Sequence, residues 1–260
     1  MPGPTRRALL AVLLLATCVP LAHDGAGAAD PASAGDVSAP DPSPAASAGR
    51  FLERSVQTRD GVTLRYLLVR PPGWDPAAEY PVLIALPPGN QTRAMVEWGL
   101  RTYWADEARR RGWVVASPMR PTDVLLFNAT DAHFEDLVAQ IARETRIAGG
   151  KVHVAGVSNG GLSAFRAAVT HPARVRALVV LPGFPPNERD YERLAALRDV
   201  PVTLYVGARD AEWVPEMQRA ERELAAAGVP VTLHVMPGED HVIRSLTGGR
   251  ALFDVLGSAS

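Results

Sequence analysis

A serine lies between a strand-like segment and a helix-like segment in the middle of the chain, within Gly156-Val157-Ser158-Asn159-Gly160. The residues before it, KVHVAGV at 151–157, have the short apolar pattern of a buried strand, and GLSAFRAAV at 161–169 has a helical pattern. A turn this sharp strains the serine backbone, and glycines two residues before and after the serine let strand and helix approach closely. The hydroxyl is therefore expected at the carboxyl edge of a sheet, where the first N–H groups of the helix also point.

The same alternation extends over the chain from residue 51 onward. The strand-like segments are 51–57, 62–69, 81–86, 113–117, 151–157, 175–181, 201–206 and 229–235, and the helix-like segments are 94–111, 134–145, 160–169, 215–228 and 243–256. Strands that alternate with helices of this length predict parallel strands joined by right-handed crossovers. The first two strands are expected to form a hairpin at Asp60-Gly61. We predict an α/β fold with a mostly parallel sheet of about eight strands and helices on both faces.

The first 28 residues are typical of a secretory signal. Arg6 and Arg7 form a positive start, residues 8–22 are apolar, and residues 26–28 fit a small-residue cleavage site. The apolar run is shorter than the roughly 20 residues of a membrane span. We therefore predict a secreted or periplasmic protein. The segment 15–18 half-resembles a lipoprotein cleavage box, so a lipid anchor at Cys18, the only cysteine, is the alternative.

Composition divides the rest of the chain into two parts. Residues 29–50 are Ala, Pro, Ser, Gly and Asp with almost nothing large and apolar, which predicts a flexible linker. Residues 51–260 are long enough for one domain with a sizeable core. The formal net charge of −1 provides no overall field to recruit nucleic acid. The sequence has neither a glycine-rich phosphate loop nor a cluster of zinc ligands, so no metal or cofactor is expected, and it leaves the oligomeric state open.

The pattern around Ser158 matches G-x-S-x-G between a strand and a helix, and residues from about 51 to 260 resemble the α/β-hydrolase family. A helix-capping serine in a glycine-rich turn is the structural alternative. In that family a triad runs in the order Ser, acid, His. Asp210, after the strand-like segment 201–206, is similar to the family's acid turn, and His241 in MPGEDH is similar to its histidine turn. In such a triad the histidine takes the proton of a weakly acidic serine, and a buried carboxylate fixes the histidine's tautomer.

Several other polar residues compete with these assignments. Asp210 is also placed to cap a helix near Pro215. Glu239 and Asp240 adjoin His241, but residues adjacent in the chain rarely point at the far nitrogen of the ring. The other histidines are assigned to packing or exposed positions (His153, His234, His171), to a loop with substrate contact left open (His133), or to the cleaved signal (His23).

The resemblance also implies an oxyanion hole with two N–H donors. In this family one donor is the residue after the nucleophile, here Asn159, and the other comes from the loop after the third strand, here LPPGNQT at 86–92. Many relatives carry His-Gly where this chain has Pro88-Gly89, and proline has no N–H. The second donor is therefore assigned to Asn90, with Gln91 as the alternative. Taken alone, the loop is also compatible with a plain surface turn.

The remaining features concern the substrate pocket. Only residues 182–200 separate the sixth strand from the seventh, where lids usually insert, so we expect a minimal lid and an open site. Phe184, Trp213 and Met119 are candidates to line it, and each is equally compatible with ordinary core packing. The segments PPGNQ, Trp98 and WVVASP resemble the feruloyl-esterase and polyhydroxybutyrate-depolymerase-like branches, whereas PGEDH is similar to dienelactone-hydrolase and peptidase-related branches.

These observations predict a serine hydrolase that cleaves a small-molecule or polymeric carboxylic ester through an acyl-enzyme. A serine peptidase or a thioesterase would use the same triad and is the alternative within enzymes. A non-catalytic surface protein that keeps the hydrolase scaffold is the alternative outside them, because folds host many functions.

Overall fold

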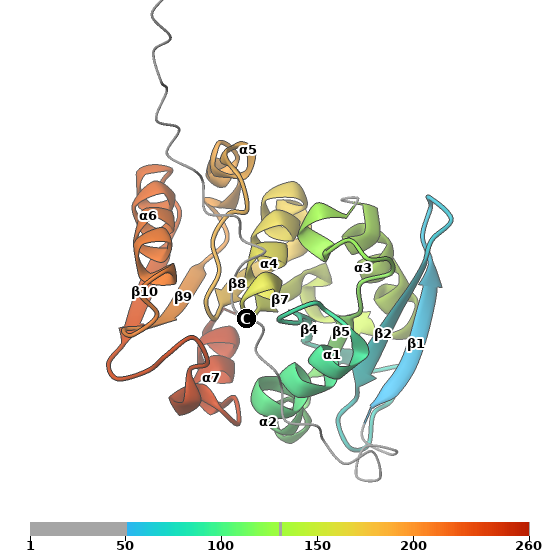
Figure 1. The fold of residues 1–260 in the computed structure, drawn as a ribbon. Coiled ribbons are helices and arrows are strands. Elements are labelled where there is room, and N and C mark those ends of the chain that lie inside the picture. The colour runs from blue at the N-terminus through green and yellow to red at the C-terminus, as the bar shows by residue number, and fades with distance from the viewer. Residues whose placement is uncertain (1–50, 130–131, 260) are drawn as a thin grey trace, which may run out of the picture. The chain divides into compact units, whose positions relative to one another are not determined.

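The strands form a sheet of eight in the order β1-β2-β5-β4-β7-β8-β9-β10 (Figure 1). The structure is a computed structural model, and the description is of residues 51–129 and 132–259; the predicted signal, Cys18 and the linker lie outside these residues. The strands are β1 (Leu52–Gln57), β2 (Thr63–Val69), β4 (Val82–Leu86), β5 (Val114–Pro118), β7 (Val152–Gly156), β8 (Val175–Val180), β9 (Val202–Gly207) and β10 (Val231–Met236). β2 pairs antiparallel with β1 and β5, and all other pairs are parallel. The mostly parallel sheet predicted from the sequence is confirmed.

Helices cover both faces of this sheet. They are α1 (Arg93–Gly99), a π-helical turn (Leu100–Trp104), α2 (Ala105–Arg111), α3 (Ala132–Glu144), α4 (Asn159–Thr170), α5 (Glu188–Tyr191), α6 (Trp213–Ala226) and α7 (Arg250–Ser258). Short 3-10 turns lie at Leu126–Asn128, Ala148–Gly150, Pro172–Arg174, Leu194–Leu197 and Arg244–Leu246. A two-stranded parallel sheet, β3 (Glu79–Tyr80) with β6 (Arg146–Ile147), was not predicted.

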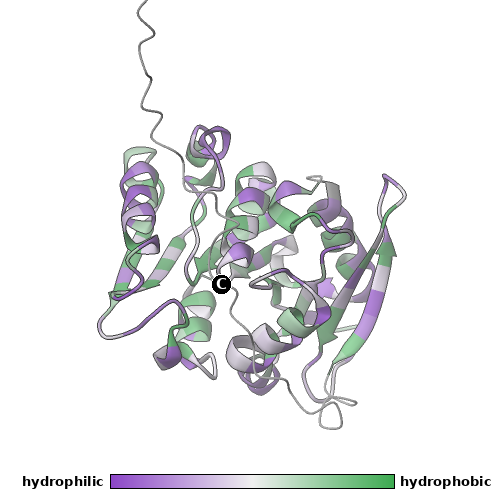
Figure 2. Ribbon diagram, viewed as in Figure 1, coloured by the Kyte–Doolittle hydropathy of each residue, from purple (hydrophilic) through white to green (hydrophobic). Residues whose placement is uncertain are grey.

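Alternate residues of the central strands face two separate cores. On β4, Ile84 packs in one core with residues of α3, α4 and α6, and Leu83 packs in the other with residues of α1, α2 and α7. Every residue of β4, β5 and β7 is buried, as expected for parallel strands covered on both sides. Figure 2 shows hydrophobic colouring along the central strands and mixed colouring on the helices around them.

The predicted helix at 243–256 is wrong in its first half, because α7 begins only at Arg250. Gly248 and Gly249 have φ angles of +79° and +80°, in the left-handed region that ends a helix rather than continuing it. A Cβ on Gly249 would lie 2.1 Å from the carbonyl oxygen of Tyr103, so glycine is required where this loop crosses the π-helical turn. The segment between His241 and α7 is therefore a loop anchored on a neighbouring helix.

The pairing of β4 with β7 positions the site. Leu86 lies opposite Gly156 in the parallel register, so the loop after β4 and the turn after β7 begin side by side at the carboxyl edge. The segments after β9 and β10 leave the same edge, because Val206 pairs with Val235 in a parallel ladder. Crevices at this edge of an open α/β sheet are where ligands bind.

Candidate active site

Ser158 lies on the sharp turn between β7 and α4. Its φ of +55° and ψ of −122° lie outside the regions that L-residues ordinarily populate. A Cβ on Gly156 would lie 2.0 Å from the Gly160 carbonyl oxygen, and one on Gly160 would lie 2.1 Å from the Leu86 carbonyl oxygen. The predicted close approach of strand and helix is confirmed, and it depends on both glycines. The Ser158 N–H donates to the Pro182 carbonyl oxygen at 3.0 Å, which ties the turn to the end of β8.

The structure brings Ser158, His241 and Asp210 together in one hydrogen-bonded chain. The Nε2 atom of His241 lies 2.9 Å from Ser158 Oγ, and its Nδ1 atom lies 2.7 Å from Asp210 Oδ2. The serine residue is 6% exposed, and the side chains of Asp210 and His241 are 9% and 23% exposed. Both ring nitrogens are thus engaged in the geometry that lets an imidazole take a serine proton on one side and be oriented by a carboxylate on the other.

Asp210 does not cap the helix that follows it. Its backbone carbonyl accepts hydrogen bonds from the N–H groups of Trp213 and Val214, whereas its carboxylate faces His241. The residue at the cap position of α6 is Glu212, which makes no side-chain capping bond. Within the described part of the chain, the Asp210 carboxylate therefore bonds to no side chain except that of His241.

Glu239 stabilises the histidine loop from its other side. Its carboxylate accepts hydrogen bonds from the backbone N–H groups of Arg244 and Ser245, at 2.8 and 2.9 Å. These bonds lower the pKa of Glu239, with the Arg244 N–H as the largest cause. The loop is tied further to the π-helical turn, where the Thr102 carbonyl accepts from the Gly248 N–H at 2.8 Å. Glu239 thus bonds the loop rather than the imidazole.

The loop after β4 contains a tight turn. The Gln91 N–H donates to the Pro88 carbonyl oxygen at 3.1 Å, so it is not free for a substrate oxygen. The N–H groups of Gly89, Asn90 and Asn159 donate to no acceptor among residues 51–129 and 132–259. The sequence predicted Asn90 and Asn159 as oxyanion donors. The unbonded N–H of Gly89 was not predicted, because no side chain marks a free backbone N–H.

Side chains connect this loop to α4. Gln91 is fully buried; its Nε2 donates to the Pro87 carbonyl oxygen at 3.2 Å and to Ser163 Oγ at 2.9 Å, and its Oε1 accepts from the Leu126 N–H at 2.7 Å. The Asn159 Nδ2 donates to the Gly89 carbonyl oxygen at 3.0 Å. Gln91 therefore holds the loop with its side chain instead of offering its N–H, which corrects its assignment as the alternative donor.

Aromatic rings adjoin the imidazole. The Trp213 ring meets His241 edge-on with centroids 5.0 Å apart, and Phe184 lies 5.1 Å from Trp213. Phe184 is partly exposed, whereas Trp213 is 5% exposed. Met119 is 3% exposed and packs in the core on the α1–α2 side, and Trp213 belongs to the core on the other face, so Phe184 is the partly exposed one of the three proposed pocket residues.

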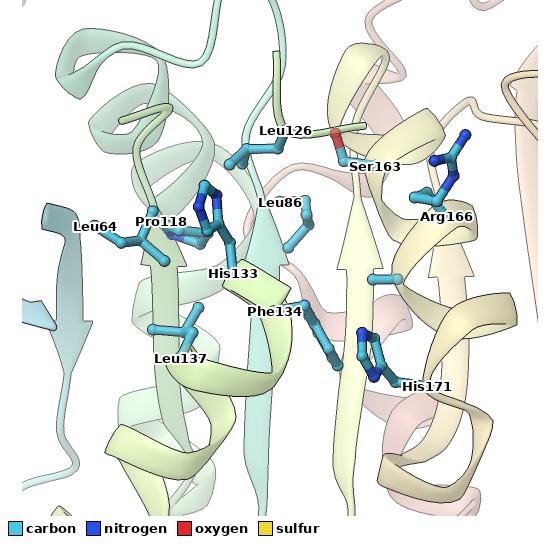
Figure 3. Close-up of a pocket in the computed structure, with 11 residues that line it drawn as sticks. Leu64, Leu86, Pro118, Leu126, His133, Phe134, Leu137, Ser163, Arg166 and His171 are labelled. Atoms are coloured by element: carbon cyan, nitrogen blue, oxygen red, sulfur yellow. The ribbon is translucent and has the colours of Figure 1, made fainter. Parts of the chain in front are cut away.

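A separate small cavity lies between α3 and α4. It has about 40 Å³, room for a very few water molecules, and Figure 3 shows Phe134, Leu137, Ser163 and Arg166 on its walls. His133 lies here too, in α3 rather than in the predicted loop, with its Nε2 3.0 Å from Asp60 Oδ2. None of the three triad residues lines this cavity, so His133 is not placed to contact a substrate at Ser158.

The other histidines lie apart from the triad. His153 is buried on β7 against Trp113, with ring centroids 4.7 Å apart, and burial lowers its pKa to about 4. His234 stacks on Tyr205, and His171 stacks on Phe134. Among the described residues, no three His, Cys, Asp or Glu side chains form a group that could hold a metal ion, and no helix there is long and apolar enough to cross a membrane.

Comparisons with known proteins agree with the geometry at the level of the fold. No family model and no curated protein sequence matches the chain. A thermostable esterase superposes with a TM-score of 0.57 at 22% identity, covering 72% of this chain and 54% of the esterase. A ferulic acid esterase superposes with a TM-score of 0.64 at 18% identity, covering 81% of this chain and 97% of the esterase. The dipeptidyl peptidase 4 of Porphyromonas gingivalis superposes with a TM-score of 0.56 at 15% identity, covering 80% of this chain and 34% of the peptidase.

Proposed function

We propose, because the chain has the α/β-hydrolase fold, that it is a serine hydrolase that cleaves carboxylic esters through an acyl-enzyme. The observation that carries the proposal is the continuous hydrogen-bonded chain from Ser158 Oγ through His241 to the Asp210 carboxylate. The strained turn at Ser158 and the free N–H of Asn159 beside it support the same reading. A scaffold that had lost catalysis would have no reason to keep all three groups in hydrogen-bond contact.

In the first half of the reaction, Ser158 Oγ attacks the acyl carbon of the ester. An Oγ–C bond forms, the hydroxyl proton moves to His241 Nε2, and the electron pair of the carbonyl π bond moves to the carbonyl oxygen. Asp210, 2.7 Å from Nδ1, stabilises the imidazolium that results. The intermediate then collapses: the bond to the alcohol oxygen breaks, and Nε2 returns the proton to the leaving alkoxide.

In the second half, water takes the place of the alcohol. His241 Nε2 removes a proton from the water as its oxygen attacks the acyl carbon, and the second intermediate expels Ser158, which regains its proton from Nε2. Both intermediates carry negative charge on the former carbonyl oxygen. The N–H of Asn159 and an N–H of the loop after β4, assigned here to Asn90, are the donors proposed to bind it.

The substrate is proposed to meet the aromatic pair Phe184 and Trp213. Trp213 adjoins His241 and Phe184 adjoins Trp213, and the segment at 182–200 contributes only α5 and one 3-10 turn. A minimal lid of this kind suits an ester with a bulky alcohol or acyl group, including a polymer end. Export is part of the proposal and rests on the sequence of residues 1–28 alone.

A hydrolysis panel tests the proposal. Wild type and Ser158→Ala are assayed on matched esters, thioesters and peptide amides, and wild type is treated with a fluorophosphonate and digested for mass spectrometry. We expect ester turnover that Ser158→Ala abolishes, together with phosphonylation of Ser158. Turnover of amides or thioesters above esters would favour the peptidase or thioesterase alternative, and absence of both turnover and label on folded protein would contradict catalysis at Ser158.

A further inference from the structure

In the loop after β4, the N–H groups of Gly89 and Asn90 are free, and the carbonyl that precedes each of them accepts a hydrogen bond. The Pro88 carbonyl oxygen accepts from the Gln91 N–H at 3.1 Å, and the Gly89 carbonyl oxygen accepts from Asn159 Nδ2 at 3.0 Å. In a trans peptide the C=O and the N–H that follows it point in opposite directions. The bond from Asn159 Nδ2 to the Gly89 carbonyl oxygen therefore directs the Asn90 N–H away from the Asn159 side chain. Likewise, the bond from the Gln91 N–H to the Pro88 carbonyl oxygen directs the Gly89 N–H away from Gln91.

The middle peptide of this turn is the one most able to rotate. A bond from residue 91 back to residue 88, a φ of +54° at Gly89 and a negative φ at Asn90 define a type II′ turn. Rotation of the Gly89–Asn90 peptide by half a turn would give type I′, which needs a positive φ at both central residues. Glycine and asparagine are the residues that tolerate this best. Two orientations of the Gly89–Asn90 peptide are therefore compatible with the backbone. In the second, the Gly89 carbonyl takes the place of the Asn90 N–H.

We infer that the Asn159 side chain is a positioning residue that holds the Gly89–Asn90 peptide in the orientation in which the loop presents N–H groups to the substrate oxygen. Asn159 then contributes to the oxyanion hole in two ways. Its own backbone N–H is one donor, and its side chain orients the peptide that carries the Asn90 N–H. The inference rests on the proposed hydrolase function. It gives a reason for an amide side chain directly after the nucleophile, where the turn itself requires none.

Asn159 is rigidly held for this task. It is the first residue of α4 and 9% exposed, and its carbonyl oxygen accepts from Ser163 Oγ at 2.9 Å. Ser163 Oγ is in turn bonded by Gln91 Nε2, so the same network reaches the loop by a second route. The Asn159 Oδ1 atom is buried and has no partner among the described residues, so the Nδ2 bond is the one interaction found for this amide.

Two substitutions test the role while keeping the backbone N–H of residue 159. Asn159→Leu removes the donor while keeping the number of side-chain heavy atoms, and Asn159→Asp keeps the shape but places a carboxylate against the Gly89 carbonyl. Asn128→Leu, at an exposed asparagine with no side-chain bond in the described structure, is the matched control. We expect both Asn159 variants to lower kcat/KM for an ester by about 10- to 100-fold, somewhat below the loss of a whole oxyanion donor. KM should change little, and Asn128→Leu should match wild type.

A boronic acid, which forms a tetrahedral anion on a serine, separates this role from simple packing. Its affinity should fall in parallel with kcat/KM in both Asn159 variants, and crystal structures of the variants should show the Gly89–Asn90 peptide rotated. Unchanged boronate affinity, or a peptide that keeps its orientation in both variants, would overturn the inference. If wild type hydrolyses no ester, the proposed function fails, and the peptide orientation in the variant crystals still decides the role of Asn159.

Discussion

The two sides of Ser158 are built from different kinds of group. On one side the groups are side chains: His241, after β10, bonds to Ser158, and Asp210, after β9, bonds to His241. On the other side, the groups that can bind a negative oxygen are backbone N–H groups of Asn159 and of the loop after β4. The first side depends on which residues are present. The second depends on how peptides are oriented, and therefore on residues such as Gly160 and Gln91 that hold the turn and the loop in place.

Replacing the acid should give the largest effect. Asp210→Asn removes the carboxylate that fixes the tautomer of His241 and stabilises its cation, so we expect kcat to fall by about 10²–10⁴-fold with the fold intact. Asp240→Asn is the matched control, because Asp240 adjoins His241 in the chain but makes no side-chain bond in the described structure. Steady-state kinetics with circular dichroism measures both. A dead Asp240→Asn beside an active Asp210→Asn would reverse the assignment.

Removing one N–H from the opposite side should cost almost as much. Asn90→Pro deletes the backbone donor, and proline accepts the negative φ that the second central position of this turn requires. Loss of one oxyanion donor typically lowers kcat by about 10²–10³-fold, so we expect that loss with KM nearly unchanged. Asn90→Ala, which keeps the N–H, is the control. If Asn90→Pro and Asn90→Ala both match wild type, the donor is the N–H of Gly89 instead.

This difference between the two sides also decides what the sequence could predict. Ser158, Asp210 and His241 were predicted because each lies in a turn after an apolar strand and each turn resembles the corresponding turn of the α/β-hydrolase family. The alternation of strands and helices likewise predicted the sheet, and the glycines two residues before and after Ser158 marked its turn. Gly89 and the bond of the Asn159 amide to it could not be predicted, because backbone N–H direction depends on tertiary contacts rather than on any local pattern.

The errors in helix prediction have the same origin. Residues 243–256 have helical periodicity, but Gly248 and Gly249 adopt left-handed φ angles where the loop packs on the carbonyl of Tyr103. The helix predicted at 94–111 is continuous in position but contains a π-helical turn at Leu100–Trp104, and the Thr102 carbonyl in that turn accepts the Gly248 N–H. Each deviation lies at a contact between segments far apart in sequence, which periodicity within a single segment does not report.

The glycine turn gives a third, smaller effect that acts through stability. Gly160→Ala would place a Cβ 2.1 Å from the Leu86 carbonyl oxygen, so β4 and α4 must separate. Overpacking of this kind typically costs about 1–3 kcal/mol, and we expect the free energy of unfolding from urea titration to fall by about that amount, with reduced fluorophosphonate labelling of Ser158. Gly257→Ala on α7, where a Cβ would meet nothing within 4 Å, is the control. Equal stability of the two variants would contradict the steric account of the turn.

The last effect concerns acid, leaves stability at neutral pH unchanged, and separates the scaffold from the triad. His153 is buried on β7, the strand that carries Ser158, and its pKa is lowered to about 4, mainly by burial and then by the charge of Arg176. In the unfolded chain a histidine takes up its proton near pH ~6.5. Between these values the unfolded state binds more protons, so His153 should make the free energy of unfolding fall as the pH drops from about 6.5 to 4. The loss should reach about 2 kcal/mol by pH ~5, at about 1.4 kcal/mol per pH unit.

His153→Leu keeps an apolar contact with Trp113 and removes this titration, so urea titrations of the variant should show a shallower decline over that interval, while Ser158, His241 and Asp210 are untouched. An identical pH dependence in wild type and variant would show that His153 is not the group that makes the scaffold acid-sensitive.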